Sequence, residues 1–134
     1  MSVEAIRQKV FKRFADFAPI DNSRKSYPNR PEAKQPASGL WANLVEIQFV
    51  MNKVASIGRE PCTRRTGTII IDIFERLDEG TKNMAMMVDE MERHFGSWTD
   101  GNLWTEPSNH TGHYNEDRAY HRVTVYVPFT YDED

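Results

Sequence analysis

The chain has 134 residues, of which 39% are hydrophobic and 28% charged, and this suits one domain over residues 1–134 with a modest core. Its longest apolar runs span only a few residues, so we expect no transmembrane helix, and its charged N-terminal segment is unlike a secretory signal. A formal net charge of −3 argues against a free nucleic-acid-binding protein, and a single cysteine excludes an internal disulfide and a cysteine-only zinc site.

The N-terminal part combines one helix with one long polar segment. Apolar residues recur at spacings of three and four from Val3 to Phe17, which predicts an amphipathic helix over residues 3–16 that Pro19 ends. Residues 22–39 hold three prolines and four basic residues against one acid, which predicts a long basic loop. Such a loop is either a flexible surface segment or an arm that orders against a neighbouring subunit.

Two strands follow. Residues 40–54 alternate between apolar and polar side chains, and Trp41, Val45, Ile47 and Phe49 are expected mostly on one face. Residues 63–75 are rich in isoleucine on both faces, which predicts a central strand. Because only a short turn-like segment separates them, we expect an antiparallel hairpin.

The C-terminal half contains a second helix and further strands. Apolar residues from Met84 to Phe95 form a helical stripe, which we interpret as core packing, with Thr81 as N-cap and Gly96 as the end. A short strand near 102–106, a polar loop over 107–117 and a last strand over 120–131 complete the pattern, with Pro128 favouring the sheet edge or the strand's end. Residues 132–134 are a short acidic tail.

This order of elements predicts an α+β fold: an antiparallel sheet of four to five strands with two helices packed on one face. The residues expected in the core are Ile69, Ile71, Ile73, Val88, Met91 and Val125.

The sequence contains no recognisable set of catalytic residues. Cys62 lacks a partner motif, and no nucleophile elbow, phosphate loop or dinucleotide fingerprint is present. His110 and His113 form a His-x-x-His pair with acids close by, which zinc sites can use, but without a second cluster they are more typical of solvated loop histidines. We therefore expect no enzyme activity and no cofactor, and a function carried by surfaces.

One stretch resembles a known family. The segment from Arg64 to Phe74 (RRTGTIIIDIF), the glycine-containing break after it, the helix with Met87-Val88-Asp89 and the terminal strand from Val123 to Phe129 are similar to small bacteriophage tail terminator proteins, also called tail completion or minor tail proteins. The resemblance covers most of the chain at the level of layout and length.

The resemblance implies a structural protein of the virion, made in the host cytoplasm. Such proteins form a hexameric ring at the head-proximal end of the tail tube, stop tube polymerisation and offer a docking face to head-completion proteins. Its partners would be further copies of the chain, the tail tube protein and a connector protein. No membrane would be bound, and DNA would only pass through the lumen.

A heterologous ring needs two complementary surfaces on each subunit. Expected interface residues lie in the basic loop, at the start of the central strand and in the histidine pair: Arg24, Lys25, Tyr27, Arg30, Lys34, Arg64, Arg65, His110 and His113. The acidic residues Asp132, Glu133 and Asp134 suit a lumen that repels DNA, although a solvated C-terminus is the simpler interpretation.

Three alternatives remain open at this point. The chain could be another head-to-tail connector such as a stopper, a small metal- or ligand-binding domain that uses His110 and His113, or a small toxin-like or regulatory domain.

Overall fold

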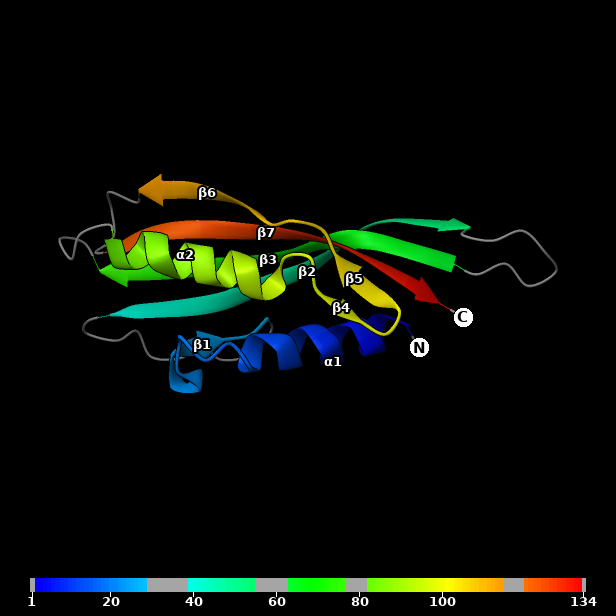
Figure 1. Cartoon of the computed structure of the whole chain (residues 1–134), viewed down its shortest axis with the longest axis horizontal. Helices are drawn as coiled ribbons and strands as arrows, with labels where there is room; N and C mark the ends of the chain where they lie inside the picture. The colour runs from blue at the N-terminus through cyan, green and yellow to red at the C-terminus, as the bar shows by residue number, and fades with distance from the viewer. Residues whose placement is uncertain (1, 29–38, 55–62, 77–81, 115–119, 134) are drawn as a thin grey trace.

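The computed structural model describes residues 2–28, 39–54, 63–76, 82–114 and 120–133. These residues form an α+β fold with two α-helices and a mostly antiparallel sheet of seven strands (Figure 1). Among the described residues no helix is long and apolar enough to cross a membrane.

Both helices form where apolar residues recur with helical spacing. In α1 (Ser2–Ala15), Ile6, Val10 and Phe14 are fully buried, and α2 (Lys82–Phe95) buries four residues of the predicted stripe. Two of these are methionines, Met84 and Met91, which confirms that the methionine-rich stripe packs in the core. The end of α2 is closed by the Gly96 N–H, which donates to the Glu92 carbonyl at 2.7 Å.

Three long strands form the centre of the sheet. They are β2 (Leu40–Val54), β3 (Thr63–Arg76) and β7 (Tyr120–Glu133), and β3 pairs antiparallel with β2 on one side and with β7 on the other. The predicted hairpin and the central position of the 63–75 strand are therefore confirmed.

Short strands complete both sides of the sheet. After the 3-10 turn η1 (Asn22–Arg24), β1 (Lys25–Ser26) pairs in parallel with β2. On the far side of β7 lie β5 (Leu103–Thr105), with β4 (Thr99–Asp100) beside it, and β6 (Asn109–Tyr114).

These short strands correct three predictions. The sheet has more strands than the four to five expected, because β1, β4 and β6 carry little apolar signal. Residues 109–114 are a strand rather than part of a polar loop, because β7 supplies a complete hydrogen-bonding partner. Residues 22–26 are likewise ordered as η1 and β1, and residues 29–38 of the predicted loop lie outside the described residues.

Pro128 lies inside the sheet rather than at its edge. It pairs with Thr68 of β3, while on the other side of β7 the β6 pairs end at Tyr126 and the β5 pairs begin at Phe129. The Pro128 carbonyl accepts from the Glu106 N–H at 2.9 Å on that side, so the proline nitrogen faces the gap between β6 and β5, where no donor is needed.

The core joins both helices to one face of the sheet. All six residues predicted to be buried are buried, and Ile69, Ile71 and Val125 have no exposed surface. The other side chains of this cluster from the three long strands are Ala42, Leu44, Ile73, Val123, Val127 and Phe129. Because these positions alternate along their strands, the opposite face of the sheet is left outside the main core.

Candidate assembly surface

Exposure rises sharply along β2. Trp41, Ala42 and Leu44 are buried, whereas every residue from Gln48 to Lys53 is exposed. We call residues 45–54 of β2 and 63–68 of β3 the distal arm. In Figure 1 the arm extends past the ends of both helices.

The distal arm carries most of the large exposed apolar side chains of the described chain. Val45 is 36% exposed, Phe49 40%, Val50 65% and Met51 52%. Phe49, Val50 and Met51 are consecutive in the sequence, and apolar side chains exposed beyond the helices favour contact with another protein surface.

Two irregularities create this surface. The β2–β3 register shifts between Leu44 and Glu46 and again between Phe49 and Met51, which leaves Val45 and Val50 as the extra residues of β-bulges. Each bulge reverses the alternation, so Trp41 and Ile47 face opposite sides of the sheet. The expectation that Trp41, Val45, Ile47 and Phe49 lie mostly on one face is therefore wrong, because the register places only Ile47 and Phe49 together.

Gly67 anchors the arm to the core. Phe49 pairs with Gly67, and the Phe49 and Phe129 rings meet edge to face with centroids 5.9 Å apart. A Cβ atom at position 67 would lie 2.8 Å from the Phe129 ring and 2.2 Å from the Gln48 carbonyl oxygen. The glycine of the RRTGT motif is thus required for close packing at the base of the arm.

The start of β3 is bound to the end of β7. Arg64 donates two hydrogen bonds to the Asp132 carboxylate, at 2.7 and 2.9 Å, and its guanidinium lies 5.3 Å from the centre of the Trp104 ring. These hydrogen bonds hold the pKa of Asp132 below its usual range. Arg65 lies 3.6 Å from the Glu133 carboxylate.

These pairs bear on two predicted sites. Asp132 and Glu133 end strand β7 and lie beside arginines, so within the subunit their charges are balanced rather than presented as a bare acidic tail. Asp134 lies outside the described residues. Assignment of all three to a lumen stays a prediction.

The predicted basic interface is divided by the structure. Lys25 is 5% exposed, and its Nζ donates to the carbonyls of Ala15 and Phe17 and to Asn22 Oδ1 at 3.1, 2.8 and 2.8 Å. Burial lowers its pKa. Lys25 thus binds the carbonyls at the end of α1, as a C-terminal cap does, and is not available to a partner.

Two further members of that set have contacts within the subunit. The Tyr27 ring packs against Phe11 and Phe14, with centroids 5.1 and 5.3 Å apart, and Arg24 Nη1 donates to the Leu40 carbonyl at 3.4 Å. Arg30 and Lys34 lie outside the described residues.

His110 and His113 do not lie in a loop. Both belong to β6, where His110 pairs with Val125 and His113 with Arg122, so their positions belong to opposite faces of the strand. His110 Nδ1 contacts the Glu92 carboxylate of α2, which joins the helix to the edge strand. Among the described residues no group of three or more histidine, cysteine or acidic side chains could hold a metal ion.

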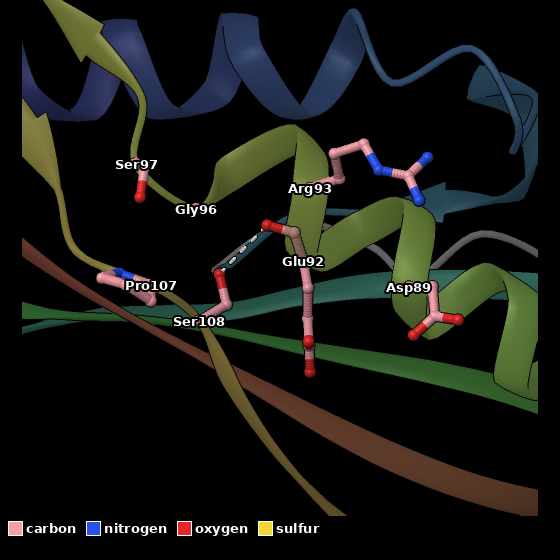
Figure 2. A pocket seen from close by; sticks show the side chains of 7 residues that line it. All are labelled: Asp89, Glu92, Arg93, Gly96, Ser97, Pro107 and Ser108. Atoms are coloured by element: carbon pink, nitrogen blue, oxygen red, sulfur yellow. Dashed lines mark hydrogen bonds between the residues drawn. The ribbon is translucent and has the colours of Figure 1, made fainter.

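Two open hollows flank this contact. One, of about 380 Å³, lies at the end of α2, where the Ser108 hydroxyl donates to the Glu92 carbonyl at 3.4 Å (Figure 2). The other, of about 280 Å³, lies between α2 and the strands β6 and β7. The first mixes acidic, basic and hydroxyl groups, an arrangement that assigns no particular ligand. Its lining residues are Asp89, Glu92, Arg93, Gly96, Ser97, Pro107 and Ser108.

The pattern of the sequence did not lead us to predict the distal arm as a functional surface. A signal was present, because Phe49, Val50 and Met51 are three consecutive apolar residues at the end of the alternating segment from Val45 to Phe49. In a strand with one covered face such a run indicates a bulge or an apolar side chain on the solvent face.

Comparison with known proteins supports the fold alone. No family model and no curated protein matches the chain. One similar solved structure, whose name states no function, superimposes with a TM-score of 0.69 at 16% sequence identity, covering 100% of this chain and 96% of its own. At this identity the likeness extends to the arrangement of elements and not to activity.

Proposed function

We propose that this chain is a bacteriophage tail terminator, a virion protein whose six copies form a ring on the head-proximal end of the tail tube. The ring stops tube polymerisation and presents a face to the head-completion protein. The resemblance of the chain's layout to that family supplies the biological role, and the distal arm supplies a surface on which assembly can depend.

The observation that carries the proposal is the exposed apolar arm. A subunit that functioned alone would gain nothing from Val50 at 65% and Met51 at 52% exposure on the outer strand of the sheet, beyond the helices. Covering these side chains with a neighbouring surface would remove apolar area from water, which stabilises association. In this ring the helix-covered part of the sheet forms the packed body of each subunit.

The structure changes which residues we assign to the contact. Lys25 and Tyr27 act within the subunit, so the basic-loop interface loses two members. The apolar residues Phe49, Val50 and Met51 take their place. Arg64 and Arg65 remain at the far end of the arm, where they pair with Lys53 and Asn52 of β2 and where their contacts with Asp132 and Glu133 hold β3 against β7.

The test is a pair of matched surface variants. Val50→Lys with Met51→Lys places two charges on the arm, and Met86→Lys places one at a 57% exposed position of α2. Both proteins should keep the wild-type melting temperature within a few degrees, since exposed substitutions cost at most about 0.5 kcal/mol. Only the arm variant should lose six-copy rings in native mass spectrometry and produce overlong, headless tails in phage made with the variant gene.

Two results would contradict the proposal. Normal tails and normal titre with the arm variant would show that the arm has no part in tail completion. Rings of another subunit number in the assembled tail would exclude the hexamer.

A further inference from the structure

We propose that the outer edge of β2 in one copy pairs with the outer edge of β6 in the next copy, so that one sheet continues across the subunit boundary. This inference rests on the proposed ring and names the contact that builds it.

The first edge is that of β2. Within the part of the chain that the structure describes, β1 covers only Ala42 and Asn43, and no strand pairs with the outer side of β2 from Leu44 to Val54. An edge of this length offers a row of backbone donors and acceptors to another strand. The bulges at Val45 and Val50 leave Glu46 to Phe49 as a regular stretch of four residues.

The second edge is that of β6. Its inner side pairs with β7 from Asn109 to Tyr114, and no described strand lies on its outer side (Figure 1). Asn109, His110 and Thr111 are exposed, and the contact of His110 with Glu92 fixes the strand to α2. A strand of six residues, held in place on one side, is long enough to receive the regular stretch of β2.

The two edges lie on opposite sides of the same sheet, in the order β2, β3, β7, β6. Pairing of β2 with β2 would be isologous and would close at two copies, whereas pairing of β2 with β6 is heterologous and leaves a free edge for each further copy. The twist between neighbouring strands, roughly 20–25°, rotates each copy relative to the last, as a closed ring requires.

Rotational symmetry also fixes the faces. All copies of a ring turn the same face outward, so the helix-covered faces lie on one side of the joined sheet. Glu46 and Gln48 pair with Ile70 and Thr68, on the face opposite to the core, and Asn109 and Thr111 pair with Tyr126 and Thr124 on that same face. The proposal therefore brings residues 46 and 48 of one copy beside residues 109 and 111 of the next.

Disulfide trapping tests this arrangement. In a Cys62→Ser background, cysteine replaces Glu46 or Gln48 together with Asn109 or Thr111, giving four double variants that sample the possible registers. Directly opposed positions on paired strands are close enough for a disulfide. At least one double variant should give a ladder up to six subunits in non-reducing gels, abolished by reductant, and each single variant should give none.

The outcomes separate this inference from the proposed function. Dimers from Gln48→Cys alone would overturn the proposal in favour of β2–β2 pairing, and no ladder from any double variant would overturn it as well. Six-copy rings and normal tails without cross-links would leave the proposed function standing while this contact fails. A full ladder from protein that does not cap tails would support the contact and contradict the function.

Discussion

The helix-covered half of the sheet and the distal arm share the strands β2 and β3, yet apolar side chains are buried in the first and exposed in the second. In the covered half, Leu44, Ile69 and Ile71 have no exposed surface, while in the arm Val50 and Met51 are more than half exposed. In the covered half, two helices of the same subunit already bury the apolar face of the sheet. No helix covers the apolar side chains of the arm. In the proposed ring, covering them with a neighbouring subunit would supply part of the free energy of assembly.

The sharpest test of this contrast places the same charge in both regions. Ile71→Asp buries a carboxylate that has no partner, which costs several kcal/mol against a total stability of about 5–15 kcal/mol. Val50→Asp leaves its charge in water. We expect Ile71→Asp to abolish soluble expression and Val50→Asp to express and fold normally, measured by soluble yield and circular dichroism. A soluble, folded Ile71→Asp protein would contradict the description of the core.

A second test concerns the one buried lysine described at the edge of the covered half. Lys25→Glu would place a carboxylate against the carbonyl oxygens of Ala15 and Phe17, to which Nζ now donates. Leaving buried acceptors without a donor costs about 1–3 kcal/mol, and a buried anion adds to that cost. Urea denaturation should show a large loss for Lys25→Glu and a smaller one, of at most about 1 kcal/mol, for Lys12→Glu at an exposed position in the last turn of α1. Equal stabilities would mean that Lys25 does not cap the helix.

A third test acts at the boundary between the two regions. Gly67→Ala adds a Cβ that would approach the Gln48 carbonyl oxygen to 2.2 Å, so backbone must move. Overpacking of this kind costs roughly 1–3 kcal/mol. Thr68→Ala, at the next position and on the other face, serves as the control and should cost less. If the two variants have the same midpoint in urea, the close approach at Gly67 is not a constraint on the arm.

The sequence predicts the covered half better than the arm, for physical reasons. Helical and strand periodicity arise from burial of one face, so Val10, Phe14 and Ile71 reveal their positions directly. Strand β6 is polar and exists because β7 offers a full row of partners, which no local pattern records. The bulges at Val45 and Val50 depend on the register of two strands, and Lys25 is buried only because α1 ends beside it.

A smaller effect should separate the regions by pH. In the covered half, His94 Nε2 bonds the Arg13 carbonyl at 2.6 Å while the Arg13 guanidinium donates to the His94 carbonyl, and burial lowers the pKa of His94 from 6.5. The carbonyl acceptor requires Nε2–H. Because the unfolded chain then binds more protons than the folded one, stability is full above about pH 6.5 and falls as the pH drops.

The His94→Gln variant checks this expectation. Glutamine can still donate to the Arg13 carbonyl and does not titrate. Between pH 7.5 and 5.5 the melting temperature of the wild type should therefore fall further than that of His94→Gln. Parallel curves for the two proteins would place the acid sensitivity elsewhere in the molecule.

The smallest effect is expected at the far end of the arm, where Arg64 pairs with Lys53 of β2 and its contact with Asp132 joins β3 to β7. Their side chains are 40% and 26% exposed, so solvent screens the pair despite its two hydrogen bonds, and a double-mutant cycle of Arg64→Met with Asp132→Asn should give a coupling of about 1 kcal/mol or less. A separate double-mutant cycle of Arg65 and Glu133, whose side chains lie 3.6 Å apart, should give a smaller coupling. Since Arg64 lowers the pKa of Asp132, this contribution should vanish as the pH falls through the acidic range below about 3.8. A coupling well above 1 kcal/mol, unchanged by salt, would mean that the arm is held as rigidly as the covered half and that the contrast between the two lies only in their apolar surface.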